Sequence, residues 1–192
     1  MIFVEKSGKY YFHYPFPVAI VGSKYNNSIN FMSAAWHTQI SFDPPLYGVA
    51  ISPKRFTKEL IEKSGMFSLN FIKYNDYKIS GFLGRTSGKD LDKINFFGIK
   101  YIKGKKLDVP ILENAIACYE CKLIDSKTYG DHILYVGEIV GIHYNENEYR
   151  DGISDGLLLY AGNDMYTKSE NTHLVKFGKE EVKDEIDKRK KL

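Results

Sequence analysis

The chain alternates apolar and polar residues over short stretches, which is typical of strands separated by turns. Asn26, Asn27 and Ser28 form a turn signal between two apolar runs and predict a hairpin. The strongest alternation covers residues 114–143 and divides at 125–132 into an antiparallel pair that closes a sheet or barrel. The pattern therefore predicts a mainly β fold, with further strands at 17–23, 39–42, 46–52, 66–72 and 155–162.

Helical patterns are short and few. Residues 57–65 predict a helix that begins with Thr57 as its N-cap and ends at Gly65. Residues 76–97 predict short helices broken by a turn. The charged tail, 178–192, is expected to form a helix that is solvated or contacts a partner.

Composition narrows the class of protein. A chain of 192 residues is expected to fold as a single domain, residues 1–192, and its 15 Tyr and 12 Phe suit a β-rich chain. A net charge of +3 without a basic stripe argues against a nucleic-acid partner. The apolar runs are too short for a signal peptide or a bilayer span, so we expect a cytoplasmic protein with no membrane partner.

Cys118 and Cys121 form a CxxC pattern, which in other proteins is a redox pair or half of a metal site. Here the pattern lies inside a predicted strand, where an offset of three places the two side chains on opposite faces. Two buried or half-buried thiols are therefore expected, and no metal site is predicted.

Candidate chemistry is concentrated just before the predicted helix 57–65. Ser52, Lys54, Arg55 and Thr57 place two cations and two hydroxyls beside a helix N-terminus, where backbone N–H groups and the helix dipole favour an anion. This combination predicts a phosphate site. The alternative is that Lys54 and Arg55 are solvated and that Thr57 only caps the helix.

Small residues upstream suit a flat ligand. Ser33, Ala34 and Ala35 carry little side chain, so their backbone can approach such a ligand closely. Trp36 either stacks on the ligand or fills the core, and composition favours the core. Motifs for hydrolase triads, zinc proteases, P-loops and Rossmann dinucleotide binding are not found, so these functions have no support.

Motifs along the chain occur in the order found in one known family. They are N-x-M-S-A-x-W at 30–36, S-F-D-P-P-L at 41–46, S-P-K-R-F-T at 52–57, S-G-K-D-L-D-K-I at 87–94 and Y-G-D-H-I-L-Y-V-G-E-I-V at 129–140. With them, roughly residues 15–166 resemble the flavin reductase-like family and, within it, the flavoredoxin-like branch. Ile94 stands where the family more often has Phe, a departure that concerns packing.

The resemblance implies an FMN-binding split β-barrel with a few short helices, working as a homodimer with the flavin near the subunit interface. By this resemblance Lys54, Arg55 and Thr57 would hold the phosphate, and Lys93 would reach the flavin from the following loop. The full set of implied FMN contacts is Asn30, Met32, Ser33, Ala34, Trp36, Ser52, Lys54, Arg55, Thr57, Ser87 and Lys93.

His132 is the implied catalytic residue, because it falls at the position where the family's histidine faces the nicotinamide side of the flavin. The alternative is a strand-end histidine hydrogen-bonded to a neighbouring loop.

The expected function is an NAD(P)H-dependent flavin or ferric reductase, with NADH or NADPH as the electron donor and FMN carrying the hydride chemistry. The alternative is a flavoredoxin-like electron carrier with permanently bound FMN and a redox protein partner. A non-catalytic FMN store or dimeric scaffold is a third hypothesis. Space for a nicotinamide near the turn 129–132 and Tyr166 would separate the first two, and sequence does not show it.

Overall fold

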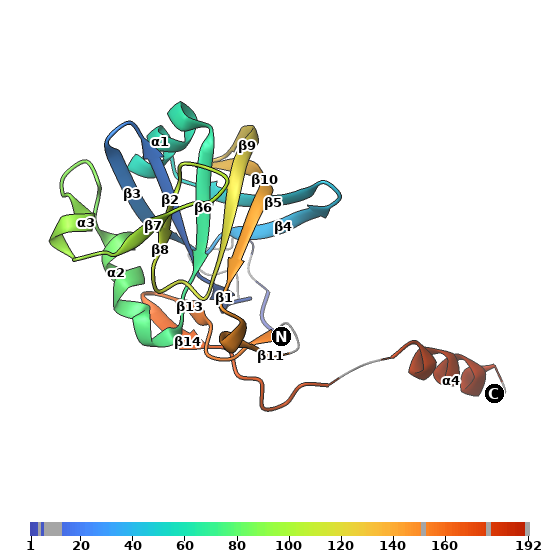
Figure 1. Cartoon of the computed structure of the whole chain (residues 1–192). Helices are drawn as coiled ribbons and strands as arrows, with labels where there is room; N and C mark the ends of the chain where they lie inside the picture. The colour runs from blue at the N-terminus through green and yellow to red at the C-terminus, as the bar shows by residue number, and fades with distance from the viewer. Residues whose placement is uncertain (4, 6–12, 151–152, 176–177, 191–192) are drawn as a thin grey trace.

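A computed structural model describes residues 1–3, 5, 13–150, 153–175 and 178–190. Seven strands form one antiparallel sheet in the order β3-β2-β6-β9-β10-β5-β4 (Figure 1). They are β2 (Ala19–Tyr25), β3 (Ser28–Ala34), β4 (His37–Phe42), β5 (Pro45–Ile51), β6 (Met66–Phe71), β9 (Ala117–Tyr129) and β10 (His132–Tyr144).

The sheet curls on itself until β3 approaches β5, and buried apolar side chains such as Val21, Phe67 and Tyr135 fill its interior. A second apolar cluster, which includes Ile20, Phe31 and Leu83, lies between the sheet and the helix α2 (Tyr77–Arg85). The predicted mainly β architecture is confirmed.

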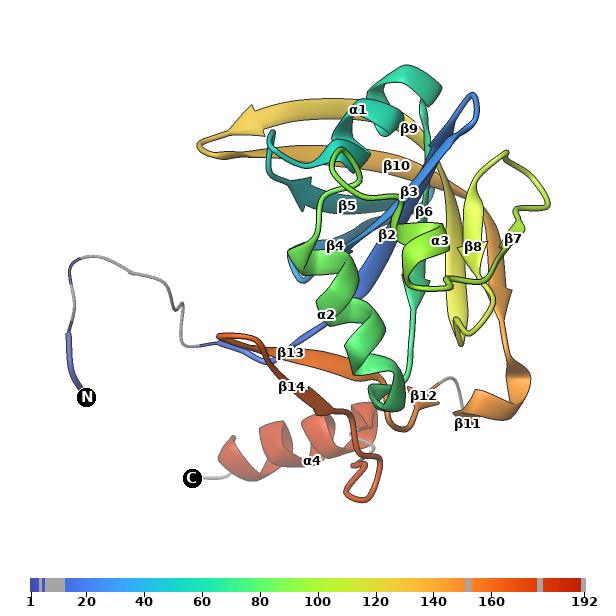
Figure 2. The ribbon, with the colours of Figure 1, turned by 90° about the vertical axis from the view of Figure 1, so that its left-hand side faces the viewer.

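Smaller elements surround the sheet. One three-stranded sheet joins β1 (Phe16–Pro17), β13 (Leu158–Gly162) and β14 (Met165–Lys168), and two short pairs are β7 (Tyr101–Lys103) with β8 (Pro110–Leu112) and β11 (Tyr149–Arg150) with β12 (Ile153–Ser154). The remaining helices are α1 (Phe56–Ser64), η1 (Tyr74–Asp76), α3 (Lys93–Phe96), η2 (Glu146–Glu148) and α4 (Lys179–Arg189). In Figure 2, α2 and α3 cover one side of the curled sheet and β13–β14 pass below α2.

The predicted hairpin around Asn26 and the predicted antiparallel pair over 114–143 are both present. Between β2 and β3 the turn residue Asn26 takes a left-handed conformation with φ 52°, as its turn-forming character predicts. Strand β9 continues to Tyr129, so the β9–β10 turn is only Gly130 and Asp131 rather than the whole predicted break at 125–132. Gly130 has φ 60°, which explains a glycine at this tight turn.

Helix α1 ends as predicted but begins differently. Gly65 takes a left-handed conformation with φ 68° and donates its N–H to the carbonyl of Ile61. The assignment of Thr57 as N-cap is wrong, because Arg55 occupies that position. Thr57 is instead turned into the protein, where its Oγ1 accepts a hydrogen bond from Asn30 Nδ2 at 2.7 Å.

Cys118 and Cys121 are both buried and carry free thiols, as predicted. Burial raises the pKa of each thiol, so both stay protonated at neutral pH and are poor nucleophiles. Within the described part of the chain, no group of three or more His, Cys, Asp or Glu side chains is arranged to hold a metal ion.

The charged tail forms α4, which lies apart from the curled sheet in Figure 1. Its Val182 and Ile186 are exposed, and Arg189 Nε donates to Glu185 Oε1 at 2.8 Å along one face. The predicted helical tail is thus confirmed over the residues that the structure describes. None of the described helices is long and apolar enough to cross a membrane.

Candidate flavin site

The start of α1 is built to receive an anion. Arg55 is the N-cap residue and supplies no side-chain acceptor to the helix. The N–H of Lys58 already bonds to the Arg55 carbonyl at 3.2 Å, so the N–H groups that precede it at the helix start are the ones suited to an external acceptor. Lys54 precedes Arg55 in the turn that follows β5, and the N–H of Arg55 bonds to the carbonyl of Ser52 at 3.0 Å, which fixes this turn. A helix start with adjacent cations favours negative charge.

A cavity of about 180 Å³ opens at this helix start; we call it the cradle. Its walls come from β3, α1, the end of α2 and the loop before α3. The lining residues are Asn30, Met32, Lys54, Arg55, Phe56, Thr57, Arg85, Thr86, Ser87, Gly88, Asp90 and Lys93. The fold therefore brings together seven predicted site residues from distant parts of the chain: Asn30, Met32, Lys54, Arg55, Thr57, Ser87 and Lys93.

Positive charge dominates the cradle. Four cations line it, against the single lining carboxylate of Asp90: Lys54, Arg55, Arg85 and Lys93. Lys93 is only 3% exposed, and its ammonium donates to the carbonyls of Phe31 at 3.0 Å and Leu83 at 2.9 Å. Burial, reinforced by the nearby charge of Arg55, lowers the pKa of Lys93 to about 8. A bound anion would relieve this repulsion.

Gly88 lets the wall of the cradle close. A Cβ atom at this position would strike the side chains of Asn30 and Phe56, so only glycine allows the loop to pack this tightly against β3 and α1. Next to it, Ser87 Oγ accepts the N–H of Lys89 at 3.1 Å.

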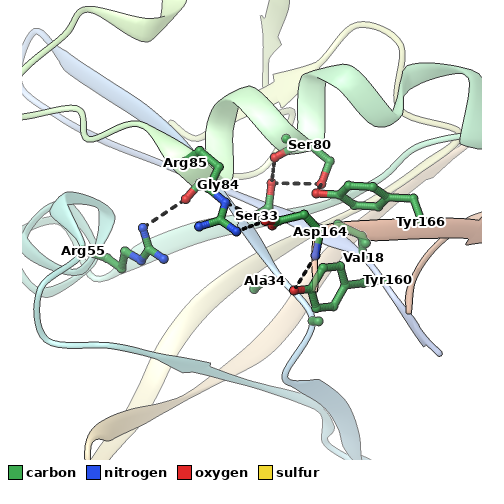
Figure 3. Close-up of a pocket in the computed structure, with 12 residues that line it drawn as sticks. Val18, Ser33, Ala34, Arg55, Ser80, Gly84, Arg85, Tyr160, Asp164 and Tyr166 are labelled. Atoms are coloured by element: carbon green, nitrogen blue, oxygen red, sulfur yellow. Dashed lines mark hydrogen bonds and ion pairs between the residues drawn. The ribbon is translucent and has the colours of Figure 1, made fainter. Parts of the chain in front are cut away.

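A second cavity of about 270 Å³ adjoins the cradle; we call it the ring cavity. Arg55 and Arg85 line both cavities, so the two spaces meet at these side chains. The ring cavity is lined by Val18, Ser33, Ala34, Ala35, Arg55, Ser80, Gly81, Gly84, Arg85, Tyr160, Asp164 and Tyr166 (Figure 3). The small residues at 33–35, which the sequence predicts to face a flat ligand, line this cavity together with glycines of α2.

Hydrogen bonds fix one wall of the ring cavity. Ser33 Oγ donates to the carbonyl of Ser80 at 2.7 Å, and Ser80 Oγ lies 3.5 Å from the Tyr166 hydroxyl (Figure 3). These contacts tie β3, α2 and β14 together. The wall is thus positioned by three elements before any ligand binds.

Trp36 and His132 lie outside these two cavities. Trp36 is 40% exposed, so the composition-based expectation that it fills the core is wrong. Its ring packs 4.7 Å from the ring of His132, and its Nε1 donates to the Tyr14 hydroxyl at 3.2 Å. His132 Nδ1 lies 2.8 Å from Asp131 Oδ1, a contact that lowers the pKa of Asp131. The catalytic role of His132 stays a prediction.

Trp36 also borders an apolar hollow of about 410 Å³, which shares Ala35 with the ring cavity. The hollow is lined by His13, Phe16, Ala35, Trp36, His37, Thr38, Gly48, Ala50 and Leu134. His37 Nδ1 pairs with the Tyr47 hydroxyl at 2.8 Å and Nε2 with the Pro17 carbonyl at 2.9 Å. Burial lowers the pKa of His37, which favours its neutral imidazole at this wall of the hollow.

The donor set suits a phosphorylated flat molecule, since cations and hydroxyls line the cradle and small residues line the ring cavity. The flavin reductase-like domain matches residues 11–169. The chain belongs to the flavin reductase-like family. Its fold is the split β-barrel expected from the sequence motifs.

Relatives with solved or curated descriptions support this membership. An FMN-binding protein from Thermus thermophilus, crystallised with bound 1-cyclohex-2-enone, is 35% identical at a TM-score of 0.84, covering 92% of this chain and 98% of that one. An uncharacterised protein of Pyrococcus abyssi is 35% identical over 139 residues, 72% of this chain and 80% of that protein. An NADH-dependent flavin reductase of Rhodococcus is 27% identical over 121 residues, 62% of this chain and 64% of that enzyme.

The structure adds candidate site residues that the sequence did not indicate. Ser80, Arg85, Tyr160 and Asp164 line the ring cavity, yet none lies in a motif that we had assigned to the site. Glycines at 81 and 84 on one face of α2 were the available signal, because they mark a place where another group approaches the helix closely. Conversely, Ser52, which was predicted to contact FMN, is not among the residues that line either cavity.

Proposed function

We propose that this chain binds FMN and acts as an NAD(P)H-dependent flavin reductase. One observation carries the proposal: a cation-lined cradle at the start of α1 meets a cavity walled by small residues, at Arg55 and Arg85. Bound FMN would supply a ring system that accepts hydride from a nicotinamide and passes electrons onward.

Different residues would bind the phosphate and contact the ring system. Lys54, Arg55 and the first-turn N–H groups of α1 hold the phosphate, and Lys93 adds a buried positive charge. Thr57 positions the wall through its hydrogen bond with Asn30. The backbone at residues 33–35 faces the ring system.

His132 is proposed as the catalytic residue on the nicotinamide side. Its ring lies against Trp36 and beside the Asp131 carboxylate, an arrangement that would orient the imidazole. A purely structural role at the β9–β10 turn predicts no change in turnover when His132 is replaced. Comparing NADH oxidation by His132→Asn with its FMN affinity separates the two readings.

The test of the proposed function uses the purified full-length protein. We expect a yellow protein, or one that turns yellow with added FMN, and oxidation of NADH or NADPH when free FMN is in excess. Lys54→Ala should raise the FMN concentration needed for half-maximal turnover, because it removes a cradle cation. A colourless protein that binds no flavin would contradict the proposal.

An electron carrier with resident FMN is the second candidate function. The side chains of Arg85 and Asp164 meet across the ring cavity, and Tyr160 and Tyr166 line it nearby (Figure 3). The two tyrosine rings would pack beside a bound flavin and slow its dissociation, which favours a permanently bound cofactor. Tight FMN binding without NADH- or NADPH-dependent turnover would support the carrier, whereas turnover faster than FMN dissociation would support a reductase with resident flavin.

We also propose that the protein works as a homodimer. Large apolar side chains are exposed on the strands β4, β9 and β10: Ile40, Phe42, Ile124, Ile142 and Tyr144. Such exposure favours burial against a second copy. Size-exclusion chromatography with light scattering tests this, and Phe42→Glu should shift a dimer toward monomer. A monomeric wild-type protein at micromolar concentration would contradict it.

Small uncharged ring carbonyl compounds are proposed as ligands of the apolar hollow. The Thermus relative was crystallised with bound 1-cyclohex-2-enone, and the hollow here is mostly apolar and adjoins the ring cavity at Ala35. Since Trp36 lines it, titration with this enone should change Trp36 emission. Unchanged emission at millimolar enone would contradict this part of the proposal.

A further inference from the structure

Arg85 is a cation shared between the two cavities. It is the last residue of α2 and lines both the cradle and the ring cavity. Its Nε donates to Asp164 Oδ1 at 3.0 Å, and its Nη2 donates to Asp164 Oδ2, a two-point contact across the ring cavity (Figure 3). Arg85 therefore connects the α2 wall to the turn between β13 and β14.

The turn that carries Asp164 is tightly bent. Asn163 and Asp164 both take left-handed conformations, with φ 50° and 59°. Asn and Asp tolerate this region better than other residues with a Cβ. The Asp164 N–H points to the Tyr160 hydroxyl at 3.4 Å. The carboxylate is thus presented to Arg85 by the turn itself.

The pair between Arg85 and Asp164 is solvent-exposed, with 69% and 55% of the two side chains accessible. Ion pairs this exposed are weak, because water and salt screen them. A phosphate dianion carries more charge than a carboxylate and offers more acceptor oxygens, and Arg binds it with two parallel N–H groups. An anion in the cradle would therefore compete successfully for Arg85.

The other guanidinium and the buried ammonium of the cradle are bonded differently. Arg55 Nη1 donates to the carbonyl of Gly84 at 3.1 Å, and Lys93 donates to the carbonyls of Phe31 and Leu83. These bonds hold their cations at the walls and need not break when an anion arrives. Arg85 differs because a carboxylate is its partner.

We propose that Arg85 determines specificity for phosphorylated ligands and that Asp164 competes with the ligand phosphate for it. When the cradle holds no anion, Asp164 engages Arg85 and pins the β13–β14 turn over the ring cavity. When a phosphate fills the cradle, Arg85 turns to it and the turn is released. This inference rests on the proposed function, since it assumes that the phosphorylated ligand is a flavin.

Substitutions of Arg85 and Asp164 are expected to change FMN affinity in opposite directions. Arg85→Gln should weaken FMN binding about 10- to 100-fold, the equivalent of one charge-assisted contact, and change riboflavin binding less than about 2-fold. Asp164→Asn should tighten FMN binding about 2- to 5-fold, because it removes a weak exposed competitor, and leave riboflavin binding unchanged. Arg85→Lys should bind FMN more tightly than Arg85→Gln but less tightly than the wild type, since it keeps the positive charge but loses the two parallel N–H donors of the guanidinium.

The experiment titrates FMN and riboflavin into the full-length protein freed of flavin, for the wild type and each variant. Lys78→Gln is the matched control, because it removes an exposed cation from the same helix at a position outside both cavities. Equal losses of FMN and riboflavin affinity in Arg85→Gln would overturn the inference, since they indicate a structural role. Weaker FMN binding by Asp164→Asn would also overturn it.

Hydrogen exchange of the wild-type protein gives a readout that needs no variant. Release of the turn predicts faster exchange of the Asp164 amide with FMN than without it, and slower or unchanged exchange would overturn the inference. A wild-type protein that binds neither flavin would overturn the proposed function as well. Tight FMN binding combined with unchanged affinities in both variants would overturn only the role of Arg85.

Discussion

The side-chain amide of Asn30 donates to Thr57 Oγ1 over 2.7 Å and so joins β3 to the first turn of α1. The two residues are 2% and 0% exposed, yet both line the cradle. This bond fixes the angle between a strand that reaches the ring cavity and a helix that presents its N–H groups to the cradle. This wall of the cradle is therefore organised before a ligand binds, which lowers the ordering cost of binding.

Replacing Thr57 by Val should destabilise the protein by about 1–3 kcal/mol, because the buried Asn30 amide loses its acceptor while the side-chain shape is kept. Urea denaturation measures the change, and Thr57→Ser is the control that retains the hydroxyl. Equal stability of Thr57→Val and the wild type would show that the hydrogen bond between Asn30 and Thr57 does not stabilise the fold.

Removing either cation at the start of α1 should weaken FMN binding. Each of Lys54→Ala and Arg55→Ala deletes a charge-assisted contact worth about 1.5–3 kcal/mol. Isothermal titration calorimetry measures the affinity. Lys58→Ala is the control, because Lys58 pairs with Glu62 at 2.7 Å on α1 and does not line the cradle. Unchanged affinity in both test variants would remove the phosphate site.

Binding of FMN near pH 8 should take up protons through Lys93. Its pKa of about 8 leaves the ammonium partly deprotonated at that pH, and a bound dianion raises the pKa because it favours the charged form. Calorimetry in buffers with different ionisation enthalpies counts the protons. Lys93→Met should abolish the uptake, and proton release by the wild type would contradict this account of the cradle charge.

Local signals in the sequence were sufficient for much of the fold. The Asn26 turn, the alternation of β9 and β10 and the Gly65 stop of α1 each depend on neighbours within a few residues. The strands β7, β8 and β14 escaped prediction because they are three or four residues long and carry little alternation. Their pairing is decided by contacts made only in the folded chain.

The site was also predictable only where local sequence signals mark it. The cations at 54 and 55 could be read from local sequence, but Arg85 and Asp164 lie 79 positions apart and meet only through the fold. Thr57 was predicted to be the N-cap because threonine is favoured there, but its hydroxyl instead makes a tertiary hydrogen bond with Asn30. Trp36 looked like a core residue because of its size, yet the β3–β4 connection leaves it exposed.

The buried carboxylate of Glu120, outside the site, should make the stability of the protein depend on pH in the acidic range. Glu120 is 0% exposed and accepts the N–H groups of Lys105, Lys106 and Leu107 at 2.9, 2.9 and 2.7 Å. His143 Nε2 lies 2.6 Å away. Burial raises the pKa of Glu120, but the hydrogen bond with His143 and the three backbone bonds outweigh it, so the pKa lies below the usual range.

A lowered pKa means that the stabilisation by Glu120 is complete above the unfolded value of about 4.3 and is lost as pH falls through the folded value. Glu120→Gln should therefore cost about 1.5–3 kcal/mol at pH 7 and flatten the fall in stability below about pH 4. Urea denaturation across pH measures both effects. The exposed Glu113→Gln is the control, and an equal pH profile for Glu120→Gln and the wild type would contradict the assignment.

The most direct test of the account is the difference in affinity between FMN and riboflavin, measured on the flavin-free protein through the emission of Trp36, the only tryptophan of the chain. The two ligands share the ring system and differ in the phosphate. A phosphate-binding cradle predicts that FMN binds about 10-fold or more tightly than riboflavin. Equal affinities, or no binding of either flavin, would contradict it.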